Sequence, residues 1–169
     1  DTPTITSISP KDFQAHMDYL HEKQFNVISI EQLIEILGSD QTIPDNSVII
    51  TFDDAYRDIL DNAVPTLKHY DFPATIFVAT ALVGSSSHYL DWSQLQRLQD
   101  AGITMANHTV THTHLLRMLL NENQETWTQR LTKEVEDAQT DLEKHLGVTD
   151  KIFAYPYGEY NCAAAARRP

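Results

Sequence analysis

The sequence predicts an α/β fold built on mainly parallel strands, arranged either as an open sheet or as an α/β barrel. Short apolar runs typical of strands alternate with amphipathic stretches that have helical periodicity along the 169 residues. The apolar run from Val48 to Phe52 is of the kind found in parallel strands covered on both faces. Since the length suits one core and no repeat of fixed period occurs, we expect a single domain over residues 1–169.

The first third of the chain supplies a helix, a strand and a second helix. Ser9 followed by a proline is typical of an N-cap and a first helical position, and we expect this helix to run to about Lys23. A short strand is expected at residues 25–29. Residues 30–37 then form an amphipathic helix, which Gly38 ends.

The middle of the chain continues the alternation. After the strand at residues 48–52 we expect a helix from Asp54 to about Tyr70, limited or kinked by Pro65. A strand at residues 74–79 and a helix at residues 92–101 follow.

The last third ends in a strand and a turn. We expect a short strand at residues 103–106 and a long helix at residues 126–146, which Gly147 stops. Residues 152–155 form the last predicted strand, and residues 156–158 turn out of it.

The charge balance limits the partners of this chain. The 12 lysines and arginines stand against 24 aspartates and glutamates, which gives a net charge of −12. Nucleic acid and anionic membrane surfaces would repel such a protein, so we expect a neutral or cationic partner. Cys162 is the only cysteine, which excludes an internal disulfide and a four-cysteine zinc site. No apolar stretch is long enough to span a membrane, and the segment that begins at Asp1 is polar and has neither the basic region nor the apolar region of a signal peptide.

Two acids and two histidines follow predicted strands. Asp53 and Asp54 end the run that begins at Val48, and His108 and His112 lie just beyond the strand at residues 103–106. The carboxyl ends of parallel strands meet at one edge of such folds, where active sites gather. Two adjacent carboxylates repel each other and lose hydration unless a cation or a shared proton relieves them. The four residues therefore indicate a site.

These residue types suit a divalent metal. Asp54, His108 and His112 supply one oxygen and two nitrogens, the ligand set that zinc and similar ions favour in catalytic sites with a position left for water. Asp53 then stays outside the metal shell and serves as general base. The alternative is that Asp53 and Asp54 cap the following helix, as aspartates at strand-to-helix junctions commonly do.

Three neighbouring features allow more than one interpretation. His114 forms a second ligand pair with His112, or else it supports the site or lies exposed. Tyr155 to Gly158 is an ordinary strand exit with aromatic packing, or its backbone N–H groups form an oxyanion hole. Asn107 begins a glycosylation sequon, which its place inside the proposed site disfavours.

Three motifs resemble those of the polysaccharide deacetylases of carbohydrate esterase family four. Thr51-Phe52-Asp53-Asp54-Ala55 resembles the first family motif, Thr-Phe-Asp-Asp-Gly. His108-Thr109-Val110-Thr111-His112 resembles the second, and Ala154-Tyr155-Pro156-Tyr157 corresponds to the Arg-x-Pro-Tyr turn of the third. The likeness extends over nearly all residues from Ser9 to Asn161. Residues 9–37 and 65–78 look like the branch that acts on biofilm poly-β-1,6-N-acetylglucosamine.

The resemblance implies roles for the candidate residues. Asp53 is the base, Asp54, His108 and His112 hold the metal, and the Tyr157 backbone amide helps to stabilise the oxyanion. Zinc is the first choice of metal, with cobalt, nickel and iron as alternatives. The fold implied is a distorted, incomplete (β/α) barrel of fewer than eight mainly parallel strands with surrounding helices.

The chain also departs from the family pattern. Ala55 replaces a glycine, and Ala154 stands where many members carry arginine. The later acidic-aromatic motif, the Leu-His-x-His segment with its histidine acid, and the opening strand with its Tyr-His pair are not found. We therefore expect a domain that lacks elements at both ends, with an atypical low-complexity tail at residues 162–169.

The implied function is metal-dependent removal of N-acetyl groups from N-acetylglucosamine polysaccharides, first of all poly-β-1,6-N-acetylglucosamine, with release of acetate. The alternatives are a chitin or peptidoglycan deacetylase and a catalytically weak, metal-containing glycan-binding domain. By resemblance the protein is secreted, periplasmic or associated with the cell envelope of a bacterium. The sequence does not indicate an oligomeric state.

Overall fold

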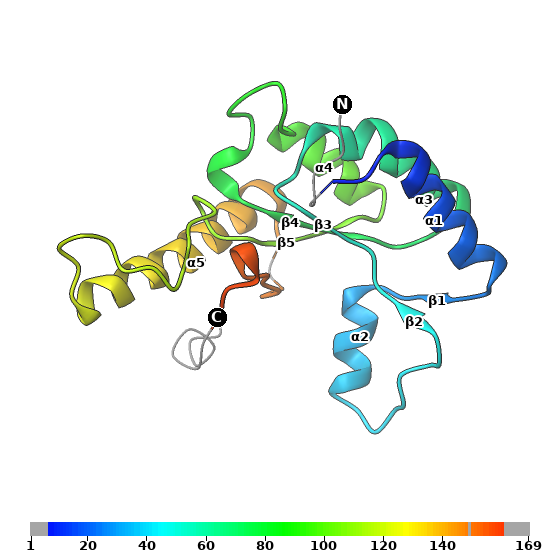
Figure 1. The fold of residues 1–169 in the computed structure, drawn as a ribbon, viewed down its shortest axis with the longest axis horizontal. Helices are drawn as coiled ribbons and strands as arrows, with labels where there is room; N and C mark the ends of the chain where they lie inside the picture. The colour runs from blue at the N-terminus through cyan, green and yellow to red at the C-terminus, as the bar shows by residue number, and fades with distance from the viewer. Residues whose placement is uncertain (1–6, 149, 161–169) are drawn as a thin grey trace.

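In this computed structural model, residues 7–148 and 150–160 are described. Figure 1 shows a mixed α/β arrangement in which short strands cross the centre and helices surround them. The helices and strands, with η marking π- or 3₁₀-helical turns, are α1 (Pro10–Glu22), β1 (Asn26–Val27), α2 (Ile30–Leu37), β2 (Ser47–Val48), β3 (Thr51–Asp53), η1 (Ile59–Ala63), α3 (Val64–Tyr70), β4 (Thr75–Val78), η2 (Thr80–Leu82), α4 (Trp92–Asp100), β5 (Thr104–Asn107), α5 (Gln124–Leu146) and η3 (Pro156–Gly158). The predicted tail at residues 162–169 lies outside the described residues.

All strand pairs between these elements are parallel. One sheet pairs β1 with β2, and the other has the order β3-β4-β5. In the larger sheet Asp53 lies beside Phe77, and Val78 lies beside Asn107. The carboxyl ends of the three strands therefore meet at one edge, which confirms the predicted parallel α/β architecture.

The helix ends follow local signals in the sequence. Ser9 caps α1 by accepting a hydrogen bond from the Asp12 N–H, and Ser29 caps α2 in a reciprocal bond with Gln32. Gly147 ends α5 with φ 65°, a left-handed conformation that glycine adopts without steric cost. These boundaries agree closely with the predicted ones because each depends on residues within one turn of the helix end.

The run from Val48 to Phe52 was wrongly predicted as one strand covered on both faces. Val48 pairs with Val27 in the smaller sheet, whereas residues 51–53 pair with β4 in the larger one. The chain changes sheet between them, and Thr51 and Asp53 are exposed because they lie on the opposite face of β3 from Phe52, which packs against the main core. The strand buried along its whole length is β4, which has neighbours on both sides.

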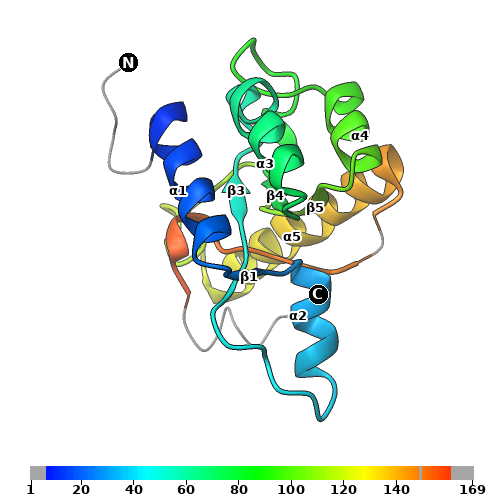
Figure 2. The same ribbon diagram turned by 90° about the vertical axis from the view of Figure 1, so that its right-hand side faces the viewer.

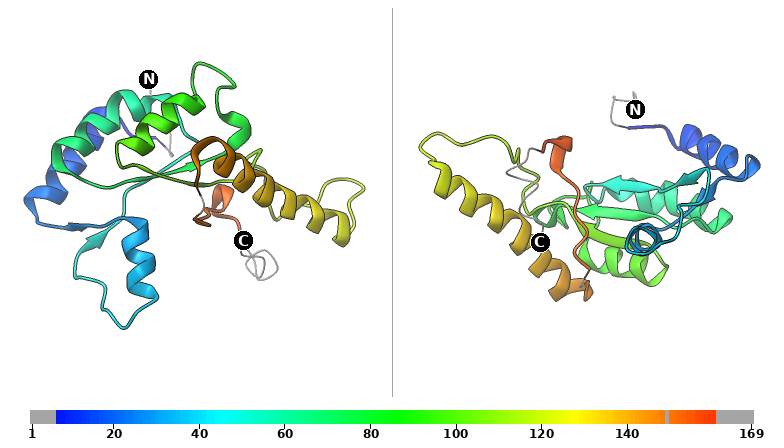
Figure 3. Two further views of the ribbon diagram at one scale, coloured as in Figure 1. Left: turned by 180° about the vertical axis from the view of Figure 1, so that it is seen from behind. Right: turned by 90° about the horizontal axis from the view of Figure 1, so that it is seen from below.

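Helices cover one face of the larger sheet, and the other face is covered only in part. Figure 2 shows α1, α3 and α4 along one face, where the main core forms around side chains such as Phe13, Leu67, Ile76 and Leu95. On the other face Phe77, Ala106 and Ile152 pack with Ile30 at the start of α2. Seen from behind in Figure 3, α2 and the β1–β2 pair extend away from the main body.

Helix α5 projects from the opposite side of the molecule (Figures 1 and 3). Its outer part is held by a separate cluster of Leu115, Trp127 and Leu131, and the Trp127 indole N–H donates to the Leu115 carbonyl at 3.1 Å. Its inner part joins the main core through Leu142 and Leu146. This anchoring fixes the helix beside the loop that follows β5.

Two other predicted elements differ from the structure. Helical structure after Asp54 begins only at Arg57 and then continues to Tyr70. It is π-helical from Ile59 to Ala63, just before Pro65, which agrees with the predicted kink at this proline. The strand predicted at residues 152–155 is reduced to one parallel bridge between Phe153 and Asn107. No helix within residues 7–148 and 150–160 has both the length and the apolar character needed to cross a bilayer.

Candidate metal centre

A left-handed turn places Asp54 at the edge of the larger sheet. Asp54 and the following Ala55 have φ angles of 66° and 58°, so the chain leaves β3 without entering a helix. The Ala55 carbonyl accepts a hydrogen bond of 3.0 Å from the Leu90 N–H, which helps to hold the turn. The alternative that Asp53 and Asp54 cap a helix is wrong, because the left-handed turn at Asp54 and Ala55 separates them from the helical residues that begin at Arg57.

The two histidines lie in a braced loop rather than on a helix. The loop leaves β5 at Asn107, whose side-chain oxygen accepts the Thr109 N–H at 2.9 Å. The Thr109 hydroxyl in turn accepts the His112 N–H at 3.0 Å. Thr109 and His112 have φ angles of 71° and 55°, and these left-handed residues turn the chain so that both imidazoles face the same way.

Glu134 on α5 holds the centre of this loop. Its carboxylate accepts the N–H groups of Val110 and Thr111 at 3.1 and 2.8 Å, and the Thr111 hydroxyl at 2.8 Å. Hydrogen bonds to a charged acceptor are about twice as strong as neutral ones. Sequence reasoning missed this residue, because Glu134 has no motif and becomes relevant only when α5 packs beside the loop.

The surroundings of His108 select one tautomer. Its ring is almost fully buried, with 2% of the residue exposed, and Nδ1 lies 3.0 Å from the carbonyl oxygen of Ala154. Because a carbonyl only accepts, Nδ1 carries the proton and Nε2 keeps its lone pair. Such a contact is the usual means by which a protein orients a histidine ligand.

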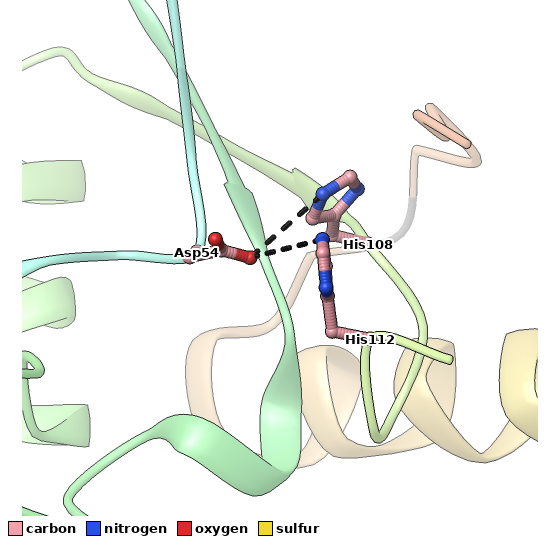
Figure 4. A group of neighbouring side chains, drawn as sticks. All are labelled: Asp54, His108 and His112. Atoms are coloured by element: carbon pink, nitrogen blue, oxygen red, sulfur yellow. Dashed lines mark ion pairs between the residues drawn. The ribbon is translucent and has the colours of Figure 1, made fainter. Parts of the chain in front are cut away.

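Asp54, His108 and His112 converge at one point (Figure 4). The Asp54 Oδ1 atom lies 3.4 Å from Nε2 of His112 and 3.9 Å from Nε2 of His108. One ligand atom from each residue falls within 4.8 Å of the other two. Asp53 is not part of this group, although its charge acts on His112.

The unsatisfied atoms of the group fit a cation. Asp54 Oδ1 and His108 Nε2 are both buried, and neither has a hydrogen-bond partner. Both are acceptors, and 3.9 Å is too long for a proton to bridge them. Bonds of about 2.0–2.2 Å at tetrahedral angles place two zinc ligands roughly 3.4 Å apart. The Asp54–His112 distance of 3.4 Å equals this value, and the Asp54–His108 distance of 3.9 Å is wider. The donor set and its geometry therefore suit a divalent ion such as zinc.

The electrostatics of His112 favour a neutral ring. Burial is the main cause that lowers the pKa of His112 below its usual 6.5, and the neighbouring His108 adds to the effect. The Asp54 and Asp53 carboxylates oppose it. Since the net direction is downward, His112 is unprotonated at neutral pH, the form in which imidazole binds metals.

A cleft of about 970 Å³ opens over Asp54 and His112, whereas His108 lies buried behind them and does not line it. Asp53, Asp54, His112 and Tyr157 line it, so the structure brings the predicted site residues to one place. Tyr157 has φ 59° and lies edge-on to His112, with ring centroids 4.6 Å apart. Asp58, Tyr56 and Tyr89 also line the cleft, and sequence reasoning did not select them.

Two of the open interpretations are now decided by geometry. His114 is outside the converging group; it stacks on the Tyr157 ring at 3.9 Å, and its Nδ1 lies 3.1 Å from a Glu159 carboxylate oxygen. The Asn107 side chain is 1% exposed and donates to the Val135 carbonyl at 2.9 Å. This burial leaves no room for a glycan on Asn107.

Comparison with known proteins gives one family and several relatives. The family model described as polysaccharide deacetylase matches residues 40–168. A putative polysaccharide deacetylase, YxkH, of Bacillus subtilis is 29% identical over 154 residues, which cover 91% of this chain and 52% of that protein. A poly-beta-1,6-N-acetyl-D-glucosamine N-deacetylase of Staphylococcus epidermidis is 28% identical over 163 residues, covering 92% and 55%. The chain thus spans about half the length of the curated relatives it matches.

Solved structures share the fold. The deacetylase PplD of Streptococcus pyogenes, in complex with acetate, matches with a TM-score of 0.84 at 26% identity, covering 97% of this chain and 70% of that one. A de-N-acetylase from Aggregatibacter actinomycetemcomitans gives a TM-score of 0.87 at 20% identity, covering 98% and 76%.

Proposed function

The chain belongs to the polysaccharide deacetylase family, and we propose that its cleft removes N-acetyl groups from N-acetylglucosamine polymers in a metal-dependent reaction. The observation that carries this proposal is the pair of buried, unpartnered acceptors on Asp54 and His108 beside the free carboxylate of Asp53. A purely structural site has no need of that additional acid, whereas hydrolysis requires a group that accepts a proton.

We assign the metal to Asp54, His108 and His112, with zinc as first choice and cobalt, nickel or iron as alternatives. When bound, such an ion lowers the pKa of a water ligand and polarises the acetamide carbonyl. The hydrogen bond from His108 Nδ1 to the Ala154 carbonyl keeps the opposite nitrogen directed at the site. The Glu134 contacts keep the His112 loop in place.

Asp53 is the proposed general base. It lies at the end of β3, is exposed to the cleft and stands outside the three-residue group. Its carboxylate takes a proton from the attacking water, and that proton is then available for the departing amine nitrogen. Water and the acetamide thus give acetate and a free amine.

The proposed oxyanion donor is the backbone N–H of Tyr157. The neighbouring Gly158 N–H is already bonded to the Tyr155 carbonyl at 2.9 Å, whereas no acceptor for the Tyr157 N–H is found among the described residues. The left-handed conformation of Tyr157 places this peptide at the rim of the cleft. A preorganised donor of this kind stabilises the negative charge that develops on the acetamide oxygen.

For the substrate we propose poly-β-1,6-N-acetylglucosamine. Relatives from Staphylococcus that are named for this polymer are 28–29% identical to this chain in alignments that cover 92% of it. We further propose that residues 1–169 act as one deacetylase domain, and that the protein meets its polymer outside the cytoplasm, as a secreted, periplasmic or cell-envelope protein. A chitin or peptidoglycan deacetylase is the alternative substrate assignment, and a metal-containing glycan-binding domain is the alternative without turnover.

Acetate release tests the proposal. The chain is loaded with zinc and incubated with β-1,6-linked and β-1,4-linked N-acetylglucosamine oligomers, and a chelator should abolish release. Asp53→Asn should lower the rate by about 100-fold or more while zinc still binds, because a general base contributes roughly that factor. Asp40→Asn, in an exposed loop that does not line the cleft, is the matched control. Preferential release from β-1,4 oligomers would favour the alternative substrates, and zinc binding without any release would favour the binding domain.

A further inference from the structure

A pair of stacked tyrosines, Tyr56 and Tyr89, borders the same cleft. The segment around Tyr56 forms an antiparallel bridge with the segment around Tyr89. Two backbone hydrogen bonds join them, from Leu90 N–H to the Ala55 carbonyl at 3.0 Å and from Arg57 N–H to the His88 carbonyl at 2.8 Å. The two tyrosine rings stack with centroids 5.0 Å apart and planes 25° apart. The backbone thus fixes the pair in place before any ligand arrives.

The Tyr56 ring remains available to a ligand. Although Tyr89 covers one side of it, 43% of Tyr56 is exposed, and both residues line the cleft. The pair therefore offers a flat apolar surface with polar edges to the cleft.

A second stacked aromatic pair, Tyr157 and His114, adjoins the metal group at His112. Tyr56 follows Asp54 by two residues, whereas Tyr157 meets the edge of His112 at 4.6 Å. Tyr157 is 57% exposed and is backed by His114, which is nearly parallel to it at 11°. One stacked pair therefore adjoins the Asp54 side of the group, and another adjoins the His112 side.

The charges of the cleft restrict what these rings can bind. Asp53, Asp54 and Asp58 line it, and no lysine or arginine occurs among the described lining residues. An anionic ligand would be repelled. A cleft of about 970 Å³ is at the upper end of the range for small-molecule sites, so more than one sugar ring fits.

We propose that the Tyr56–Tyr89 pair is a sugar-binding subsite, on which a pyranose ring adjacent to the reacting sugar stacks its apolar C–H face. The ligand class is a linear hexosamine oligosaccharide that is uncharged or carries free amines. This inference rests on the proposed deacetylase function, because that function requires the reacting sugar to bind at the metal group. Tyr157 and His114 bind the sugar ring that lies next to the reacting sugar at His112.

Binding in a turnover-blocked protein tests the subsite. The Asp53→Asn chain with zinc is titrated with a β-1,6-linked N-acetylglucosamine pentamer, followed by calorimetry or by NMR shifts. Adding Tyr56→Ala should raise the Kd by about tenfold, whereas Tyr56→Phe, which keeps the flat ring, should change it less than about twofold. Tyr19→Ala is the matched control, since Tyr19 is 54% exposed on α1 and pairs with Phe25 away from the cleft.

A further variant guards against misfolding. Tyr56→Leu keeps apolar bulk but lacks a planar face, and it should lose affinity as Tyr56→Ala does. Equal Kd values for Tyr56→Leu, Tyr56→Phe and the unmodified residue would overturn the subsite. Acetate release that persists in Tyr56→Ala with unchanged KM would also overturn it while leaving the deacetylase function intact. If the unmodified chain with zinc releases no acetate while its Kd still rises in Tyr56→Ala, the proposed function is overturned and the subsite stands.

Discussion

Asp54 and His112 approach each other to 3.4 Å between Oδ1 and Nε2, and both residues adopt left-handed backbone conformations, with φ 66° and 55°. A non-glycine residue in this region costs about 1–2 kcal/mol. Both residues of this contact carry the cost, although one follows β3 and the other lies in the loop after β5. Strain of this kind is commonly found where a site has to be held in one arrangement.

Removal of a ligand should abolish tight zinc binding. For Asp54→Asn, His108→Gln and His112→Gln we expect zinc affinity to fall by about 100-fold or more, since loss of a residue that only supports a ligand already costs 10–100-fold. Competition with a chelating dye measures this. His16→Gln, on the exposed side of α1, is the control and should bind zinc normally.

Zinc should also stabilise the unmodified protein. At a free concentration of 100 times the Kd, the free energy of unfolding should rise by about 2.7 kcal/mol, because the ion binds only the folded site. The three ligand variants should lose this increment in urea denaturation. An equal increment in the His108→Gln protein would contradict the assignment.

Glu134 should act on the metal through the histidine loop. Glu134→Ala removes the carboxylate that accepts the Thr111 N–H and the Thr111 hydroxyl, so the loop that carries His112 should be held less firmly. The Val110 N–H loses one acceptor but keeps its 3.0 Å bond to the backbone carbonyl of residue 134. We expect about a tenfold loss of zinc affinity with α5 still helical by circular dichroism. Glu136→Ala, on the exposed side of the same helix, should leave the affinity unchanged.

Ala55→Gly should have little effect on stability. Relief of the left-handed alanine gains about 1–2 kcal/mol. Loss of its buried methyl group costs about 0.8 kcal/mol, and the greater freedom of glycine in the unfolded chain costs about 0.4–1 kcal/mol. The sum lies within about 1 kcal/mol of zero, which explains how alanine is tolerated where the related motif has glycine. Ala15→Gly, in the exposed interior of α1, should cost about 1 kcal/mol in the same urea titration.

Acidification should destabilise the metal-free protein through His112. Its folded-state pKa is lowered below 6.5, mainly by burial, so the unfolded chain takes up the proton first as the pH falls. The free energy of unfolding should therefore decrease from about pH 6.5 down to the lowered pKa and then level off. Urea titrations at several pH values should show a shallower slope in this window for His112→Asn than for His16→Gln. Identical slopes for the two variants would rule out the linkage.

The sequence by itself determined the boundaries of α1 and α2, the end of α5 and the composition of the candidate site. Ser9, Ser29 and Gly147 act through hydrogen bonds and backbone conformations within one helical turn, so their effect is readable from a short stretch of sequence. Asp54 and His108 were recognisable because each follows a strand, and parallel strands end at one edge.

Only the tertiary structure decided how these pieces are held. The division of the Val48–Phe52 run between two sheets depends on partners elsewhere in the chain, as does the bracing of the histidine loop by Glu134. The stacking of Tyr56 on Tyr89 likewise joins segments that periodicity and capping signals do not connect. Local signals extend over a few residues, whereas pairing, packing and the left-handed turns at Asp54 and His112 are imposed by contacts between distant parts of the chain.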